Sequence, residues 1–125
     1  MPPTTPTQLH EALTAAFNAH DLDALLALYE PDALLVTRPG RTVRGTAAIS
    51  GAFAVILSLR PTFTIETGTV LEAGDLALLH STWQLRGTGP DGAKVENSGK
   101  GADIARRQAD GSWLLVVDNA YAADS

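Results

Sequence analysis

The sequence predicts an α+β domain, with three N-terminal helices packed on one face of a single curved, mostly antiparallel sheet. Apolar residues recur at helical spacing through the first half of the chain. The second half consists of runs rich in Val, Ile, Thr and aromatic residues, separated by turn residues at positions 74–75, 89–92 and 110–111. Helices followed by consecutive hairpins are typical of an α+β fold.

Length and composition indicate one ordinary globular domain. The chain has 125 residues, of which 45% are hydrophobic and 18% charged. We expect a flexible N-terminal tail at residues 1–6, a single domain at residues 7–121 and a C-terminal tail at residues 122–125. The net charge of −5 and the scattered positions of the nine Lys and Arg residues argue against a nucleic-acid partner.

Several classes of site are excluded by residue content. The chain contains no cysteine, so it has no disulfide, no Cys-ligated zinc and no thiol nucleophile. Its histidines, at positions 10, 20 and 80, lack the close spacing of metal ligands. We therefore expect neither a metal nor a cofactor. The N-terminus lacks the features of a signal peptide, and no apolar run approaches the roughly 18 residues of a membrane span. A cytoplasmic protein without a membrane partner is expected.

Capping residues mark the three predicted helices. Thr5 is the expected N-cap of the first helix, with Pro6 at its first position and Gln8 completing a capping box. Asp21 is expected to cap a second, shorter helix that ends at positions 30–31, where a proline follows. Thr46 is the expected cap of a third helix at residues 47–59.

The predicted strands form a curved sheet around a pocket. They span residues 33–37, 62–67, 69–73, 76–86, 94–108 and 113–119. Asp110 and Gly111 predict a hairpin that makes the last two strands antiparallel neighbours. A curved sheet closed by helices forms a cone that is open at one end, and small domains bind ligands in such concavities.

Four segments resemble motifs of the NTF2-like superfamily. Residues 19–25 (AHDLDAL) and 29–33 (YEPDA) are similar to its opening motif, and residues 45–49 (GTAAI) to its "G-x-x-A-I" helix start. The stretch from Gly101 to Trp113, which contains DGSW, is similar to its closing hairpin. The similarity is closest to the SnoaL-like and DUF4440 (SgcJ/EcaC-type) branch. It implies a cone-shaped barrel with an internal pocket, usually a homodimer through the outer face of the sheet.

The superfamily includes ketosteroid isomerase, cyclases, dehydratases and epoxide hydrolases, so function depends on individual residues. The resemblance places Thr37 at the position of the isomerase's proton-shuttling aspartate and Leu13 at that of its oxyanion-hole tyrosine. It places Asp103 at the position of the protonated aspartic acid that is the second oxyanion donor. Because only Asp103 retains a catalytic residue type, we do not expect isomerase chemistry by that mechanism.

Asp103 is the predicted catalytic residue. It stands among small and apolar residues at positions 101–105, where a charge is rare unless a polar pocket or the surface receives it. In a pocket its pKa would be raised by desolvation, and it could donate a hydrogen bond or act as an acid or base. The alternative is an exposed residue paired with Lys100 or Arg106.

Other polar residues are candidates for ligand binding. Strand alternation places His80 and Trp83 on opposite faces of one strand, and both have structural alternatives, as a hydrogen-bonded histidine and a core tryptophan. Candidates at the predicted mouth of the cone are Thr37, Arg38, Asp118, Asn119 and Tyr121. The alternatives there are an exposed turn for Arg38 and a solvated chain end for the last three.

Two functions follow as hypotheses. The first is a pocket for a small hydrophobic molecule, as in a cyclase, isomerase or hydrolase that acts on a carbonyl-bearing metabolite. The second is a non-catalytic association module, which predicts a cavity filled by Leu13, Phe17, Phe53 and Trp83, without a titratable pair. A homodimer is expected because the predicted sheet is apolar on both faces. One face is expected to carry Leu34, Val36, Leu114 and Val116, and the other Leu35, Leu115 and Val117.

Overall fold

The computed structural model describes residues 2–124, so the parts of the two predicted tails at positions 1 and 125 lie outside it. The elements follow in the order α1 (Pro6–Asn18), α2 (Leu22–Leu26), β1 (Tyr29–Arg38), β2 (Arg41–Arg44), α3 (Thr46–Leu57), β3 (Thr62–Ala73), β4 (Leu76–Thr88), β5 (Lys94–Arg107) and β6 (Trp113–Asn119), with a 3-10 turn at Ala122–Asp124.

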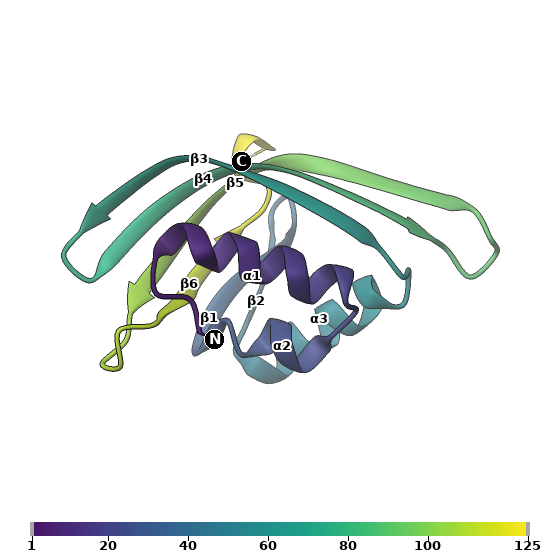
Figure 1. Ribbon diagram of the computed structural model, residues 1–125. Helices are drawn as coiled ribbons and strands as arrows, with labels where there is room; N and C mark the ends of the chain where they lie inside the picture. The colour runs from purple at the N-terminus through teal and green to yellow at the C-terminus, as the bar shows by residue number, and fades with distance from the viewer. Residues whose placement is uncertain (1, 125) are drawn as a thin grey trace.

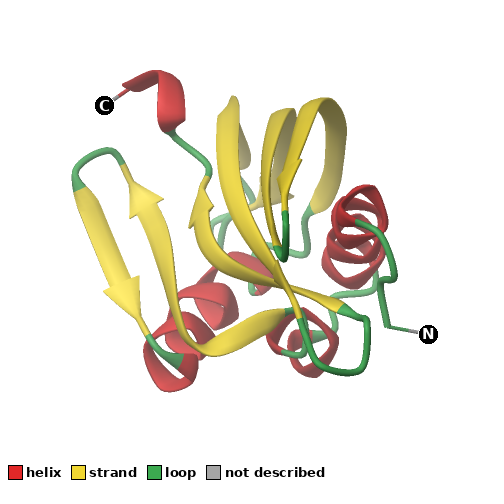
Figure 2. Cartoon of the chain, turned by 90° about the vertical axis from the view of Figure 1, so that its left-hand side faces the viewer, coloured by secondary structure: helices red, strands yellow, loops and turns green. Residues whose placement is uncertain are grey.

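The strands form one six-stranded sheet in the order β2-β1-β6-β5-β4-β3. All neighbours are antiparallel except β1 and β6, which pair in parallel. The sheet arches over the helices, and α1 lies within its concave side (Figure 1). Figure 2 shows the same layers from the side, with the chain end after β6 leading into the short 3-10 turn. The predicted α+β class and single curved sheet are confirmed.

The first helix begins as the sequence predicts. The Thr5 side chain accepts a hydrogen bond from the Gln8 backbone N–H, and Pro6 occupies the first turn. The Gln8 side chain, however, accepts from the backbone and hydroxyl of Thr4 rather than from Thr5. Pro3 is buried, and its carbonyl accepts from the Trp113 backbone N–H at 2.9 Å, which fixes this part of the lead-in on β6.

The second helix is shorter than predicted, and β1 starts earlier. Asp21 caps the helix as expected, but the helix ends at Leu26 and Tyr29 already pairs with Leu115 of β6. Pro31 is accommodated in the strand because the register shifts between Tyr29 and Leu34. The strand therefore does not need a ladder donor from Pro31.

The third helix and the strand before it correct two further expectations. The N-cap of α3 is Gly45, with φ at 89° and no side-chain cap, so Thr46 is the first helical residue and not the cap. The short strand β2 was not predicted, because Arg41–Arg44 lacks an apolar alternation. The predicted strands at 62–67 and 69–73 are one strand, β3, with a register shift between Thr67 and Val70.

An extra residue in β6 controls which side chains face the helices. Ala105 of β5 pairs with Leu115, but the next β5 residue, Ile104, pairs with Val117, so Val116 has no partner on β5. After this bulge the alternation is inverted. Val117 faces outward with Ile104, and Asp118 faces inward opposite Asp103. The predicted placement of Val117 on the same face as Leu115 is therefore wrong.

The core lies between the concave face and the helices. Leu9, Leu13 and Phe17 of α1 are buried with Phe53 of α3 and Phe63 of β3. The ring of Phe17 contacts both aromatic neighbours, with centroid distances of 5.5 Å to Phe53 and 4.5 Å to Phe63. This packing holds α1 beneath the sheet.

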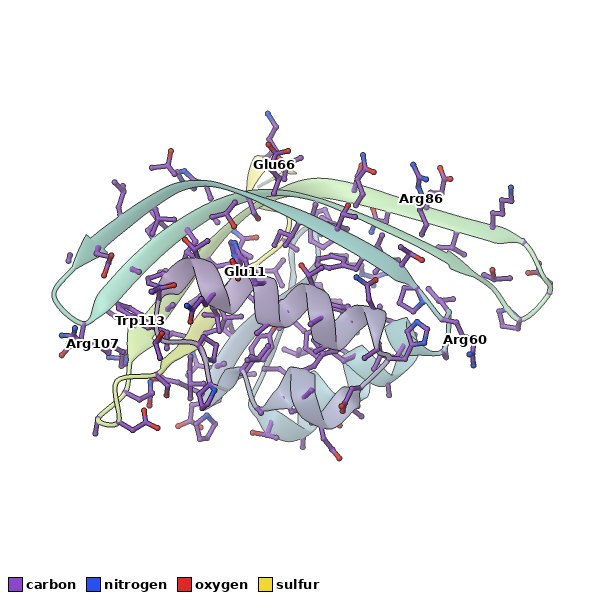
Figure 3. The ribbon with its side chains drawn as sticks, viewed as in Figure 1. Glu11, Arg60, Glu66, Arg86, Arg107 and Trp113 are labelled. Carbon is purple, nitrogen blue, oxygen red and sulfur yellow. The ribbon has the colours of Figure 1, made fainter. Side chains whose placement is uncertain are left out.

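The convex face carries both polar and apolar side chains. Glu66 and Arg86 point away from the helices, whereas Trp113 lies below the sheet (Figure 3). Within residues 2–124, no helix is both long enough and apolar enough to cross a membrane.

Close backbone packing at Gly99 predicts a specific loss of stability. A Cβ added there would lie 2.9 Å from the Ala120 carbonyl oxygen and 3.0 Å from the Trp83 ring, so the chain end after β6 must shift. We expect Gly99→Ala to lower the free energy of unfolding by about 1–3 kcal/mol, the usual cost of overpacking. Thermal and urea unfolding measure this change. Gly68→Ala is the matched control, since the nearest atom is 3.6 Å away. Equal effects of the two substitutions would contradict this account.

Candidate functional site

A cavity of about 540 Å³ lies between the concave face of the sheet and the helices. Its walls are mainly apolar and aromatic, with contributions from Phe17, Phe53, Phe63 and Leu85. Six residues predicted from the sequence line it: Thr37, Arg38, Trp83, Asp103, Asp118 and Tyr121. The hypothesis of a non-catalytic module predicted a cavity filled by Leu13 and its aromatic neighbours, without a titratable pair. Leu13 does line the cavity, but the cavity is open and contains two carboxyl groups.

The two carboxyl groups form a hydrogen-bonded pair. Asp103 and Asp118 are register partners on β5 and β6, and their side chains hydrogen-bond to each other. Asp103 is 3% exposed, and its Oδ1 also accepts from the Asn119 backbone N–H at 3.2 Å. Asp118 keeps part of its surface accessible, and it lines the cavity.

His10 contacts Asp103 without lining the cavity. Its Nε2 lies 2.9 Å from Asp103 Oδ2, and its Nδ1 lies 2.8 Å from the Thr67 hydroxyl. A neutral imidazole satisfies both contacts, with the Thr67 hydroxyl donating to Nδ1 and Nε2–H donating to Asp103. His10 was not predicted as a site residue. The sequence could have predicted its burial, because His10 precedes Leu13 by three residues and Phe17 by seven. This helical spacing places it on the buried stripe of α1.

Tyr29 supports Asp118 in the same way. Its hydroxyl donates to Asp118 Oδ2 at 2.5 Å, and its ring is 6% exposed and packs near Phe53. The sequence prediction missed this role because Tyr29 was assigned to a helix. Neither Tyr29 nor His10 lines the cavity, so both position the carboxyl groups rather than reach a ligand.

Burial raises the pKa of both carboxyl groups. The pKa of Asp103 rises to about 7 because of desolvation, although its hydrogen bonds to Asp118 and Asn119 oppose the rise. The pKa of Asp118 rises to about 8, through desolvation first and the charge of Asp103 second. Burial lowers the pKa of His10, an effect that the charge of Asp118 opposes. Between about pH 7 and about pH 8 the pair therefore holds about one proton, with Asp118 donating to Asp103.

Two predicted ligand-binding residues lie elsewhere. His80 is exposed on the convex face, because it alternates with the inward-facing Leu79 and Ser81, so its assignment to the cavity is corrected. The Asn119 side chain does not line the cavity either. Its carbonyl oxygen accepts from the Tyr121 backbone N–H. Asn119 thus contributes through its backbone contact with Asp103.

The segment after β6 forms part of the cavity wall. Trp83 Nε1 donates to the Ala120 carbonyl oxygen at 2.7 Å, and the Trp83 ring meets the Tyr121 ring edge-to-face at 5.6 Å. The Tyr121 hydroxyl accepts from the Asn97 side chain at 2.9 Å. Residues 120 and 121 are therefore attached to β4 and β5 beside the cavity. Across the described side chains, no cluster of three or more His, Cys, Asp or Glu residues is arranged to hold a metal ion.

A family model described as the SnoaL-like domain matches residues 10–116. This range includes His10, Tyr29 and Asp103 but ends before Asp118. No curated protein matches the sequence significantly. The finer assignment to the DUF4440 branch stays a prediction.

Several solved structures share the fold. A ketosteroid isomerase-like protein from Erwinia carotovora atroseptica is 22% identical with a TM-score of 0.78, and the match covers 90% of this chain and 88% of that one. A proposed dehydratase of the NTF2-like family from Streptomyces avermitilis is 20% identical with a TM-score of 0.73, covering 90% and 89%. A proposed calcium/calmodulin-dependent protein kinase II association domain from Xanthomonas campestris is 23% identical with a TM-score of 0.78, covering 90% and 81%. At these identities the likeness shows the fold alone.

The raised carboxyl pKa values predict how stability depends on pH. Unfolding returns both groups to a pKa near 3.8, so the folded protein holds protons that the unfolded chain releases. The free energy of unfolding therefore falls as pH rises, until pH exceeds the folded pKa values of about 7 and about 8. The lowered pKa of His10 has the opposite effect, but only below its unfolded value of 6.5.

We therefore expect Tm to fall between about pH 6.5 and 8.5, and to fall less steeply in Asp118→Asn. The amide introduced by that substitution can still donate to Asp103 and accept from Tyr29, but it does not ionise. Thermal unfolding across this range measures the difference, with the exposed Asp75→Asn as a control. A fall in Asp118→Asn as steep as in the unchanged protein would contradict the assignment.

Proposed function

The chain belongs to the SnoaL-like domain family of the NTF2-like superfamily, and we propose that it binds a small carbonyl compound and catalyses proton transfer on it. The observation that carries the proposal is the pair Asp103 and Asp118, hydrogen-bonded to each other in an apolar cavity. Isomerisation, cyclisation and dehydration next to a carbonyl all require this step.

The pair supplies both an acid and a base near neutral pH. In the free protein the Asp118 proton is donated to Asp103. When a carbonyl compound is bound, the protonated carboxyl of Asp118 donates to the carbonyl oxygen instead, and the carboxylate of Asp103 accepts a proton from the neighbouring carbon. The substrate becomes an enol, and the pair again holds one proton. A group works best in this role when its pKa lies near the working pH, which agrees with values of about 7 and about 8.

The surroundings of the pair favour this chemistry. His10 and Tyr29 hold the two carboxyl groups from the side away from the cavity, so the geometry does not depend on a ligand. The apolar walls exclude water and strengthen each electrostatic interaction with the reacting oxygen. The volume of about 540 Å³ lies within the usual range for small-molecule sites, about 300–1,000 Å³. An association module with a filled cavity would need neither the volume nor the pair.

Exchange of carbon-bound hydrogen tests the proposed step. We expect the protein to accelerate exchange of the α-hydrogens of 2-tetralone in deuterated buffer, measured by NMR. Asp103→Asn and Asp118→Asn should each lower this rate by roughly a hundredfold, since each removes one partner in proton transfer. The same two variants should also bind 2-naphthol, a stable analogue of the enol, more weakly than the unchanged protein does.

The matched control for this experiment is Asp75→Asn, which alters an exposed carboxylate that is paired with Arg107 and does not line the cavity. It should exchange 2-tetralone as the unchanged protein does. The proposal is wrong if both cavity variants retain the full exchange rate while remaining folded by circular dichroism.

We also propose that the protein forms a homodimer through the convex face. Five apolar residues, one from each of five neighbouring strands, lie in one cross-strand line: Leu71, Leu78, Ile104, Val117 and Leu34. Leu71 is 56% exposed and Ile104 is 37% exposed. A contiguous apolar line on a sheet face is characteristic of an interface, and a second copy presents the same line.

Sedimentation velocity at micromolar concentration should therefore show a dimer. Ile104→Lys should give a monomer, because a charge at the centre of the line cannot be buried without a partner. Ala15→Lys adds the same charge on the exposed side of α1 and should leave the dimer intact. A monomeric unchanged protein would exclude this interface.

A further inference from the structure

Two arginines stand at the mouth of the cavity. Arg38 ends β1 and Arg41 begins β2, on either side of a two-residue turn. They are the only basic side chains along the described lining, and both are exposed. The hairpin thus places positive charge beside the entrance of a mainly apolar cavity, in a chain whose net charge is −5.

The two charges lie close together without a carboxylate partner. Arg38 and Arg41 are cross-strand partners, so their side chains share one face of the hairpin. Like charges in this arrangement repel each other. Within the described side chains, neither arginine takes part in an ion pair; the pairs that do form join His10 to Asp103, Arg106 to Glu30 and Arg107 to Asp75. An anion bound between the two arginines would relieve the repulsion and accept hydrogen bonds from both.

The aspartate pair, in contrast to the arginines, selects against an anion. The hydrogen-bonded pair Asp103 and Asp118 is a poor neighbour for a carboxylate but can donate to a neutral oxygen. The lining also includes apolar and aromatic side chains, among them Phe53, Ile56 and Leu59. Along β1 the aspartates and the arginines are separated, because Leu35 pairs with Asp118 and Arg38 follows Leu35 by three residues. The cavity therefore combines a proton-donating pair, apolar walls and a pair of cations.

We propose that the ligand is a keto acid with a ring-containing apolar body, oriented with its carbonyl at Asp103 and Asp118 and its carboxylate between Arg38 and Arg41. This inference rests on the proposed function, because it assigns the substrate class of the same cavity. Arg38 and Arg41 act as specificity residues. They select an anionic group distant from the reacting carbonyl, and they also fix the direction in which the molecule enters.

Three probes distinguish binding at the aspartate pair from binding at the two arginines. The first is 2-naphthol, which offers only the enol-like hydroxyl. The second is 6-hydroxy-2-naphthoate, which adds a carboxylate at the far end of the same rings, and the third is its methyl ester, which has the same shape without the charge. Titration by fluorescence or calorimetry should show the acid binding about tenfold more tightly than the ester, as expected for charge-assisted hydrogen bonds.

The double variant Arg38→Gln with Arg41→Gln should remove this advantage, so that the acid and the ester bind with similar affinity. Arg44→Gln is the matched control, since Arg44 lies on the same strand, is exposed and does not line the cavity. It should retain the full advantage of the acid. Circular dichroism checks that each variant is folded.

The outcomes distinguish the two proposals. If 2-naphthol binds and depends on Asp103 and Asp118, but the acid gains nothing over the ester, the substrate class is wrong and the proposed function stands. If the advantage of the acid survives in the double arginine variant, Arg38 and Arg41 do not bind the carboxylate, so this inference is wrong and the proposed function stands. If no probe binds, or if Asp103→Asn and Asp118→Asn bind 2-naphthol as tightly as the unchanged protein does, the proposed function is wrong and this inference is wrong with it.

Discussion

The bulge at Val116, the residue of β6 that is skipped in the pairing with β5, is the constraint on which the site depends. Side chains of a strand alternate between its faces, so one inserted residue reverses the face of every residue that follows. Without the bulge, Asp118 would point outward and Val117 would enter the core. With it, two aspartates from neighbouring strands meet inside the cavity, and Val117 joins the outward line of apolar residues. One irregularity thus determines both the chemistry of the concave face and the composition of the convex face.

The pair is held by strands and a helix rather than by loops. Asp103 receives contacts from α1 through His10 and from the backbone of β6, while Asp118 receives one from β1 through Tyr29. Each buried oxygen therefore has a partner, which offsets part of the cost of removing two carboxyl groups from water. What remains of that cost is expressed as raised pKa values. The apolar surroundings that destabilise the charged pair at high pH are the same ones that make it an acid near neutrality.

The sequence predicted the class of fold, the order of elements and most strands, because helical spacing, strand composition and turn residues are local signals. It predicted Asp103 from its unusual neighbours, and Thr37, Arg38, Trp83, Asp118 and Tyr121 at the cavity. It could not predict that Asp118 faces Asp103, because the bulge arises from the pairing of β6 with β5 and no local sequence pattern indicates it. For the same reason Tyr29 and His10 were missed as partners of carboxyl groups about 90 positions away in the chain. Pairing also explains β2, which is a strand only because β1 lies beside it.

The two tryptophans occupy very different environments. Trp113 is 2% exposed and does not line the cavity, whereas Trp83 is part of the cavity wall and donates from its indole nitrogen to the chain end. Indole emission responds to the polarity and hydrogen bonding around the ring. A molecule that enters the cavity changes the surroundings of Trp83 but not those of Trp113. The protein therefore carries an intrinsic optical reporter of cavity occupancy, with the second tryptophan as an internal reference in the same chain.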